Sequence, residues 1–392
     1  MRDSYTIVAA VLVTTALVGG VGGVAAGAQP TVDQPTDIGP LQADDPTEPA
    51  TCEFPLELTD ATGETITLDE PPERVTTTTP SAAQTVWELG EQDRVVGLTR
   101  FAFYLDGAEE KEDVSGDFGA DVERVVGTEP DLVLAPNQSV ANVQPLRDAG
   151  ETVYHFPAAT SVDDIADMTT TTGQLLGACD AAADTNEEMY DAVEDAEERT
   201  AGLDRPAALY PVGDGYVAGS NTFIDDMMTI GGVDNVAAAE GDGYPQLSAE
   251  VVLETNPELI LVTDSEASIL DEEPYASTTA GQEGNYVVMD ENYVNQAAPR
   301  SVMESTETLA DAVVDLQAEE DEADADADAD DTATDDDAAD DDTADDDAGD
   351  EAADDEAADD DADDATGFEV PGFGAVPALI AALAAALLAR RD

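Results

Sequence analysis

The sequence predicts an α/β protein with two Rossmann-like lobes, joined by a long helix and followed by a disordered acidic tail. Three observations support this fold class. Strand-like apolar runs alternate with helical patterns between residues 52 and 317, one 14-residue motif occurs twice, and residues 319–366 are almost entirely acidic residues and alanine. The length of 392 residues also exceeds the usual size of a single hydrophobic core.

The first 50 residues precede the expected core. Arg2 provides a charged start, residues 7–18 are apolar, and the small residues at 26–28 fit a cleavage site. Residues 1–28 are therefore predicted to be a secretory signal peptide, with a first transmembrane helix as the alternative. Residues 29–50 are rich in Pro, Asp and Thr, which favours a flexible leader.

The charge balance is strongly acidic along the whole chain. There are 92 Asp and Glu against 12 Lys and Arg, which gives a formal net charge of −80. Segment 319–366 holds 28 of these acids and no base, so the rest of the chain still carries −52. Nucleic-acid binding needs a basic surface and is not expected. The composition resembles that of extreme halophiles, in which salt screens carboxylate repulsion; an ordinary acidic secreted protein is the alternative.

The core divides at one segment with a different pattern. In 180–203, Met189, Val193 and Ala196 recur at helical spacing among many acids, which predicts one long, half-exposed helix. We therefore expect a first lobe at 51–178, an interlobe helix at 179–204 and a second lobe at 205–318. Strand-like runs occur in both lobes, at 94–98, 131–135, 152–156, 207–212 and 259–262.

Cys52 and Cys179 are the two cysteines of the chain. Neither belongs to a CxxC pair, and His155 is the one histidine, so no Cys/His zinc site and no other metal site is expected. Two lone cysteines in an exported protein more often form a disulfide than remain free thiols, which predicts a Cys52–Cys179 bond. His155 follows a strand and is interpreted as structural rather than as a ligand of cobalt or haem iron.

An internal repeat relates the two lobes. Residues 121–134 (DVERVVGTEPDLVL) and 248–261 (SAEVVLETNPELIL) each predict a capped helix that ends near a proline and leads into a strand. Glu123 and Glu250 then occupy equivalent places in the first turn of equivalent helices. One interpretation is that each glutamate only complements its helix dipole. The other is that the pair forms a two-sided docking surface.

A second repeated pair supports the duplication. Leu89-Gly90 and Ile230-Gly231 each end a predicted helix and lead into a strand at identical offsets. The spacing between the two repeated motifs is about 14 residues longer in the first lobe, which predicts an insertion near 100–116. A ligand is expected between the lobes, where the carboxyl edges of the sheets face each other.

Candidate ligand residues follow the predicted strand ends. Aromatic side chains there suit a large, flat, partly apolar ligand, although each could instead belong to the core. Arg300 is interpreted either as the partner of a ligand carboxylate or amide, or as part of a helix cap or internal ion pair. The candidates are Pro80, Ser81, Phe101, Phe103, Tyr104, Asn137 (which also begins a glycosylation sequon), Gln138, Tyr216, Asn221, Phe223, Tyr244 and Arg300.

Several blocks of the sequence resemble the periplasmic binding proteins for vitamin B12 and iron chelates. They are PERVTTTTPSAAQTVWELGEQDRVVGLT (72–99), ERVVGTEPDLVLAP, VAGSNTFIDDMMTIGGVDNVA, SAEVVLETNPELILV and NQAAPRSVMESTETLADAV (295–313). The resemblance covers about 52–317 and implies the class III binding-protein fold, with a rigid interlobe helix and modest closure on the ligand. It also implies that one glutamate per lobe docks onto arginines of a permease dimer; by motif position these are Glu123 and Glu250.

The C-terminal region predicts an anchor. Residues 319–370 form an acidic segment that cannot bury a core and is expected to be disordered. Pro371-Gly372-Phe373, the apolar residues 374–389 and two final arginines resemble the archaeal Pro-Gly-Phe sorting signal, which implies archaeosortase-like processing and a lipid anchor. The apolar run is shorter than the roughly 20 residues of a usual membrane span.

Together these features predict a halophilic archaeal substrate-binding protein of an ABC importer, not an enzyme, held on the outer face of the cell membrane. We expect it to capture cobalamin, without a further cofactor, and to deliver it to the permease dimer and its ATPase subunits. A ferric siderophore or haem is the alternative ligand. A carboxylate-based surface enzyme and a surface-layer component are less favoured, because Glu123 and Glu250 lie on different lobes and no array of β-domains is present.

Overall fold

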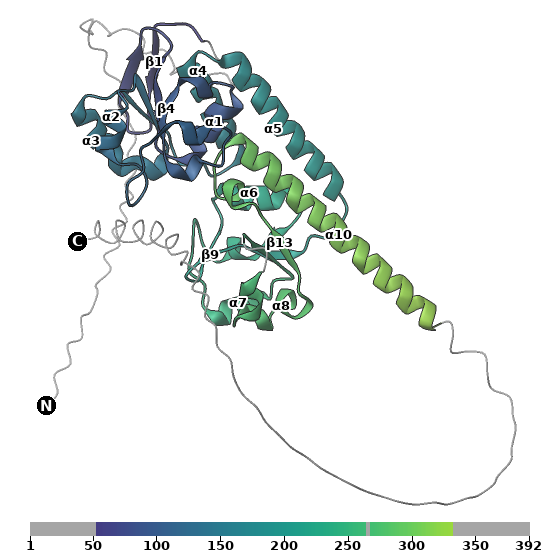
Figure 1. Ribbon diagram of the computed structural model, residues 1–392. Helices are drawn as coiled ribbons and strands as arrows, with labels where there is room; N and C mark the ends of the chain where they lie inside the picture. The colour runs from purple at the N-terminus through teal and green to yellow at the C-terminus, as the bar shows by residue number, and fades with distance from the viewer. Residues whose placement is uncertain (1–51, 264–266, 332–392) are drawn as a thin grey trace, which may run out of the picture. The chain divides into compact units, whose positions relative to one another are not determined.

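A computed structural model of the chain describes residues 52–263 and 267–331 (Figure 1). The predicted signal peptide at 1–28, the leader at 29–50, most of the acidic segment and Pro371-Gly372-Phe373 lie outside the described residues. Those assignments stay predictions.

The first lobe is built on a parallel sheet with the strand order β5-β4-β3-β6-β7. All four residues of β6 are buried, as expected for a strand covered on both faces. An antiparallel hairpin of β1 and β2 precedes this sheet. The elements are β1 (Leu56–Thr59), β2 (Thr65–Leu68), β3 (Val75–Thr77), α1 (Pro80–Glu88), β4 (Val95–Leu98), β5 (Glu112–Asp113), α2 (Val122–Gly127), β6 (Leu132–Ala135), α3 (Val140–Ala149) and β7 (Val153–His155).

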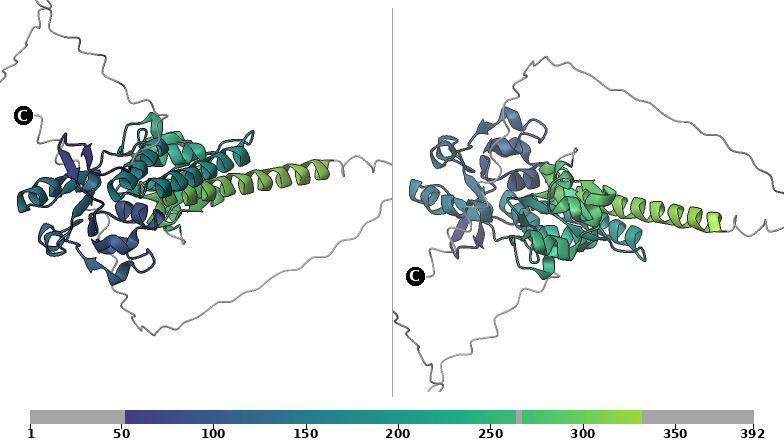
Figure 2. Two further views of the ribbon diagram at one scale, coloured as in Figure 1. Left: turned by 90° about the horizontal axis from the view of Figure 1, so that it is seen from above. Right: turned by 90° about the horizontal axis from the view of Figure 1, so that it is seen from below.

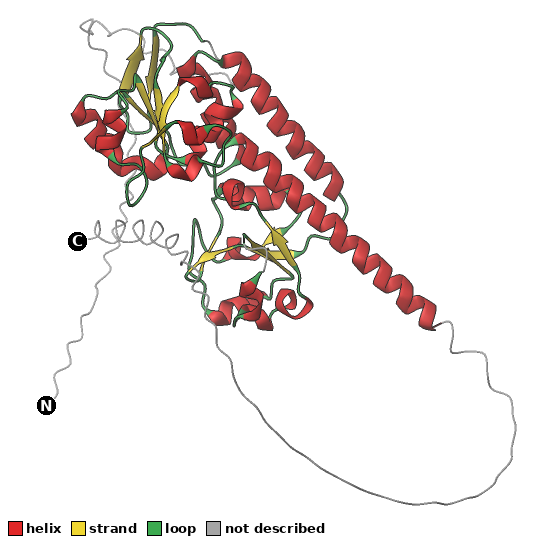
Figure 3. Cartoon of the chain, viewed as in Figure 1, coloured by secondary structure: helices red, strands yellow, loops and turns green. Residues whose placement is uncertain are grey.

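The second lobe contains a smaller parallel sheet with the order β11-β8-β12-β13. In both lobes helices flank the sheet (Figure 3). The elements are β8 (Ala207–Leu209), β9 (Pro211–Gly213), β10 (Tyr216–Val217), α6 (Phe223–Ile230), β11 (Asp234–Asn235), α7 (Ala249–Thr255), β12 (Leu259–Val262), α8 (Thr279–Glu283), β13 (Tyr286–Val288) and α9 (Glu291–Val294).

The two sheets repeat one arrangement, which confirms the predicted two-lobed α/β fold. β3 lies between β4 and β6, just as β8 lies between β11 and β12. Helix α2 leads into β6, and helix α7 leads into β12, so the two copies of the repeated motif take equivalent places. The additional edge strand β5 and two 3-10 turns lie in the segment where the spacing predicts an insertion.

Two antiparallel helices, rather than one, run between the two cores. Helix α4 (Val162–Leu176) places Ile165 in the core of the second lobe and Leu175 in the core of the first. Helix α5 (Cys179–Thr200) returns in the other direction, with Ala182 in the first core and Met189 in the second. The sequence predicts only α5, because the threonines of α4 obscure its apolar pattern; the Thr169 hydroxyl donates to the Ile165 carbonyl at 2.8 Å.

Helix α10 (Pro299–Asp331) lies beside α5 (Figures 1 and 2). It continues to Asp331, so the prediction that disorder begins at residue 319 is wrong for the first part of the acidic segment. Val302, Leu309 and Val313 pack in the core of the second lobe and fix the first half of the helix. Alanine and glutamate favour helix, and each added residue then extends a helix that is already nucleated.

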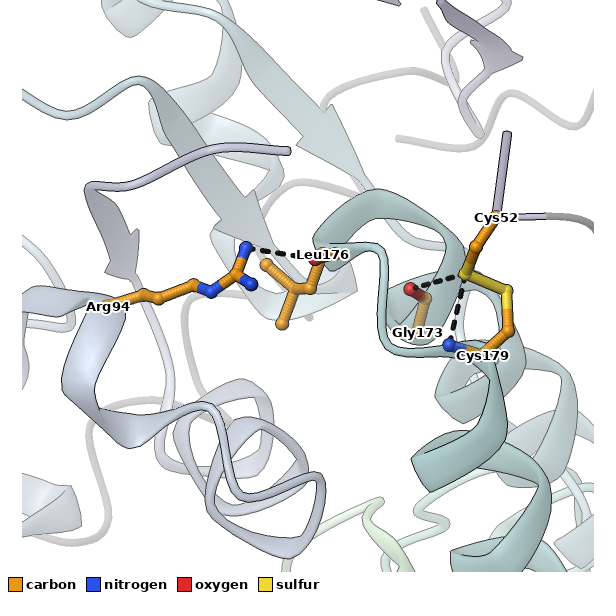
Figure 4. Close-up of a disulfide and its surroundings, with 5 residues drawn as sticks. All are labelled: Cys52, Arg94, Gly173, Leu176 and Cys179. Carbon is orange, nitrogen blue, oxygen red and sulfur yellow. Dashed lines mark hydrogen bonds between the residues drawn. A yellow bond between two sulfur atoms is a disulfide. The ribbon is translucent and has the colours of Figure 1, made fainter. Parts of the chain in front are cut away.

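The predicted disulfide between Cys52 and Cys179 is present, with the two Cα atoms 5.9 Å apart (Figure 4). It ties the start of the described chain to the first residue of α5. The Cys179 backbone N–H donates to the Cys52 sulfur at 3.0 Å, and the Arg94 guanidinium donates to the Leu176 carbonyl at 2.9 Å. Since the bond closes a loop of 127 residues, it stabilises the fold by on the order of 4 kcal/mol.

Asp60, in the turn between β1 and β2, has a fully buried side chain. Its carboxylate accepts the backbone N–H groups of Thr62 at 2.8 Å and His155 at 3.1 Å, and it pairs with Arg147. Burial by itself would raise the pKa of Asp60, but the hydrogen bonds from Thr62 and His155 and the charge of Arg147 outweigh it and hold that pKa below its ordinary value. The charged carboxylate thus fastens the β1–β2 hairpin to strand β7.

We predict that Asp60→Asn lowers the free energy of unfolding by about 3 kcal/mol near neutral pH, because it removes the buried negative charge that pairs with Arg147. The lowered folded-state pKa means that the carboxylate stabilises the fold above the unfolded-state pKa, and that this stabilisation disappears as the pH falls through the folded value. The deficit of the variant should therefore shrink toward acid. Denaturant unfolding from neutral to acidic pH measures both effects.

The matched control is Asp234→Asn, which breaks an exposed pair with Arg205. It should cost under about 1 kcal/mol. Equal losses in the two variants, or a deficit of Asp60→Asn that does not depend on pH, would contradict the assignment.

Candidate functional site

The carboxyl ends of the strands mark the candidate site, because both sheets are entirely parallel and α/β proteins bind ligands at this edge. In the first lobe, Pro80 and Ser81 follow β3, Phe103 and Tyr104 follow β4, and Asn137 follows β6. In the second lobe, the predicted residues follow β8 and β11. Most of the candidates therefore lie in the segments that follow these strand ends.

Within the first lobe, the predicted residues differ in exposure. Phe101 is 48% exposed, and the Arg100 guanidinium lies 5.8 Å from the centre of its ring, a cation–π contact. Asn137 and Gln138 are exposed. Ser81, in contrast, is buried inside the first turn of α1. Phe101, Asn137 and Gln138 are therefore the candidates of this lobe with exposed side chains.

Within the second lobe, Tyr244 is 40% exposed and Asn221 is exposed in a left-handed backbone conformation. Tyr216 is partly buried on β10. Phe223 lies in the core at 6% exposure, because the first turn of α6 faces inward, and the structure does not present it to a ligand. Its assignment as part of a ligand-facing wall is therefore corrected to a core position.

Arg300 lies at the start of α10 and binds Glu88 at the end of α1. Its Nε and Nη2 atoms donate to the two carboxylate oxygens of Glu88 at 3.1 and 2.8 Å. Beside this pair, the rings of Tyr104 and Tyr293 meet edge to face with centroids 5.9 Å apart. Of the two interpretations of Arg300, the internal ion pair is the one present in the structure.

Two hollows bear on where a ligand can bind. One, with a volume of about 10 Å³, holds at most a single water and is lined by Ser81, Pro136, Phe156 and Ala297 among others. This hollow is therefore too small for a ligand. A second hollow of about 440 Å³, lined by Glu70, Pro71, Glu73, Asp93 and Arg94, lies where β3 and β4 begin, the opposite edge from that used by ligands of α/β proteins.

Glu123 and Glu250 are both exposed, each in the first turn of its helix. The caps are as predicted: the Asp121 carboxylate accepts the Arg124 N–H at 2.9 Å, and the Ser248 hydroxyl accepts the Val251 N–H at 3.3 Å. Helices α2 and α7 each end where a strand of the parallel sheet begins. Each helix therefore starts near the opposite edge of its sheet, which is the carboxyl edge. The two glutamates therefore flank the same edges as the ligand candidates.

His155 makes a contact inside the first lobe. Its side chain is buried, and its Nδ1 atom lies 2.8 Å from the Ala135 carbonyl oxygen. Among residues 52–263 and 267–331, no cluster of three His, Cys, Asp or Glu side chains is suited to a metal ion. The same part of the chain contains no helix that is long and apolar enough to cross a membrane.

Comparison with known proteins identifies the family. The sequence profile of the family described as "Periplasmic binding protein" matches residues 75–293, from β3 into α9. The chain belongs to this family. As a periplasmic binding protein it binds a small-molecule substrate for an ABC transporter and is not an enzyme, and its working partner is the transporter's permease.

One relative of this periplasmic binding protein is a cobalamin-binding protein from Halobacterium salinarum. It is 46% identical over 268 residues, which cover 64% of this chain and 72% of the relative. Two solved structures show the same fold. They are a haem-binding protein from Roseiflexus sp. RS-1 (TM-score 0.56, 22% identity, 62% of this chain and 99% of that chain) and the vitamin B12-binding protein of Vibrio cholerae (TM-score 0.54, 21% identity, 62% and 97%).

Proposed function

We propose that this periplasmic binding protein captures cobalamin outside the cell and delivers it to an ABC importer. The observation that carries the proposal is the 46% identity to a cobalamin-binding protein along most of both chains. The exposed aromatics Phe101 and Tyr244 at the carboxyl edges support it, since they suit a broad, partly apolar ligand. His155 is buried, which argues against haem ligation by this histidine.

We predict that the purified protein binds cyanocobalamin with micromolar or tighter affinity, about −8 kcal/mol or better. Replacing Phe101 and Tyr244 with alanine should weaken binding, because each substitution removes aromatic contact area. Calorimetry in molar salt measures both. Absence of cyanocobalamin binding, together with tight binding of haem or a ferric siderophore, would replace cobalamin by that ligand while leaving the transport role intact.

Delivery is proposed to use Glu123 and Glu250 as permease contacts, one on each lobe. Their exposure and equivalent positions support a partner that touches both lobes. We predict that Glu→Ala at either position leaves cobalamin affinity and thermal stability almost unchanged, since each helix loses only a small dipole contribution. Cellular cobalamin uptake should fall, and most in the double variant, because charged groups of the partner lose their counterparts.

The matched control for this test is Glu254→Ala, an exposed glutamate of α7 outside its first turn. It should take up cobalamin normally. Normal uptake in the double variant would reduce Glu123 and Glu250 to helix-end residues. A collapse of ligand affinity would instead place them in the ligand site.

The location is proposed to be the outer face of the cell membrane. Secretion would remove residues 1–28, and Pro371-Gly372-Phe373 would direct attachment of the C-terminus to a lipid. The terminal apolar segment and arginines support this arrangement. The intact mass of the mature protein tests it, because an unprocessed C-terminus would exclude the lipid anchor.

A further inference from the structure

The first turn of α10 receives its cap from another element. The first backbone N–H groups of a helix have no acceptor within the helix, and a side-chain oxygen at the N-cap usually satisfies one of them. Here the residue before the helix is Ala298, whose carbonyl accepts the Val302 N–H at 3.3 Å but whose side chain has no oxygen. The Ser301 N–H and hydroxyl instead donate to the Gln84 side-chain oxygen of α1, both at 3.1 Å.

This contact fixes the orientation of the Gln84 amide. Gln84 and Ser301 are both completely buried, and the Ser301 N–H can only donate, so the amide oxygen of Gln84 must face it. The Gln84 Nε2 atom consequently points the other way and donates to the Tyr104 hydroxyl at 2.9 Å. The Tyr104 oxygen is thereby used as an acceptor, and its own proton is left to be donated.

No group among residues 52–263 and 267–331 accepts the Tyr104 proton. Burial raises the pKa of Tyr104 to about 12, and it outweighs the lowering by the hydrogen bond from Gln84; the charges of Asp290 and Glu88 raise it further. The hydroxyl therefore keeps its proton at physiological pH. Tyr104 is partly buried at the carboxyl edge of the first lobe, against Tyr293 of the second lobe.

We infer that Gln84 is a positioning residue, which caps α10 across the junction of the lobes and presets Tyr104 as a hydrogen-bond donor to the ligand. The inference rests on the proposed function and adds that the ligand must carry a hydrogen-bond acceptor. The preferred ligand group is an oxygen acceptor, such as the side-chain amide carbonyls of a corrinoid. Gln84 acts through Tyr104 and does not itself contact the ligand.

A double-mutant cycle on the full chain tests this coupling, with cyanocobalamin as the probe. Tyr104→Phe should weaken binding about fivefold to tenfold, the usual worth of one hydrogen bond. Gln84→Met should weaken binding at least as much, and the double variant should bind no more weakly than Gln84→Met alone. The matched control is Tyr190→Phe, which removes a hydroxyl that donates to Asp163 at 2.8 Å on the exposed side of α5 and should leave affinity unchanged.

A measurement without ligand tests the capping role separately. Hydrogen exchange at the start of α10 should quicken in Gln84→Met and stay slow in Tyr104→Phe. If Gln84→Met does not fold, Gln84→Glu replaces it. The new carboxylate still accepts from Ser301 but also accepts the hydrogen bond of the Tyr104 hydroxyl, so exchange should stay slow while affinity falls.

If Tyr104→Phe binds cyanocobalamin as tightly as the wild type, or if the two single losses of affinity add up in the double variant, Gln84 does not preset Tyr104 as a donor to the ligand. If hydrogen exchange at the start of α10 is unchanged in Gln84→Met, Gln84 does not cap this helix. If the wild-type protein binds no cyanocobalamin, the proposed ligand fails, and the exchange measurement still decides whether Gln84 caps α10.

Discussion

The contact between α1 and the first turn of α10 is the constraint on which the arrangement of the two lobes depends. Gln84 and Glu88, one helical turn apart on α1, bind Ser301 and Arg300 of α10. Further along, α10 passes so close to α6 that a side chain at Gly231 would collide with Leu309. One helix is thus fixed to both lobes, to the first by buried hydrogen bonds and to the second by close packing.

Several of the described arginines hold elements of the fold together. Arg74 donates to the carbonyl of Glu129 at 2.8 Å, Arg205 to that of Val233 at 2.9 Å, and Arg300 is held by Glu88. A guanidinium that already has acceptors contributes little to an anionic ligand. Neutral groups are also present at the carboxyl edges, among them the Tyr104 hydroxyl and the Asn137 amide, and these suit an uncharged, amide-rich ligand.

The sequence predicted best what depends on local patterns or on strict chemistry. The caps of α2 and α7, the duplicated order of helix and strand, and the single possible disulfide all follow from residue types at fixed spacing. The direction in which a side chain points does not follow from such patterns. Phe223 and Phe101 were both predicted to face the ligand, but Phe223 is buried in the core whereas Phe101 is exposed.

Long-range contacts escaped prediction for a related reason. Gln84 and Ser301 are separated by 217 residues, and neither belongs to a motif that would single it out. The length of α10 was also underestimated, because an acidic composition predicts disorder while the packed first half of the helix supplies the nucleus that composition cannot reveal.

The ligand is proposed to bind at the carboxyl edges of both lobes. Hydrogen exchange of the whole protein, with and without cyanocobalamin, tests it most directly. We predict that cyanocobalamin slows exchange in the loops that hold Phe101, Asn137 and Tyr244, on both lobes at once. Slowing confined to one lobe, or to the hollow around Glu70 and Arg94 at the opposite edge, would contradict it.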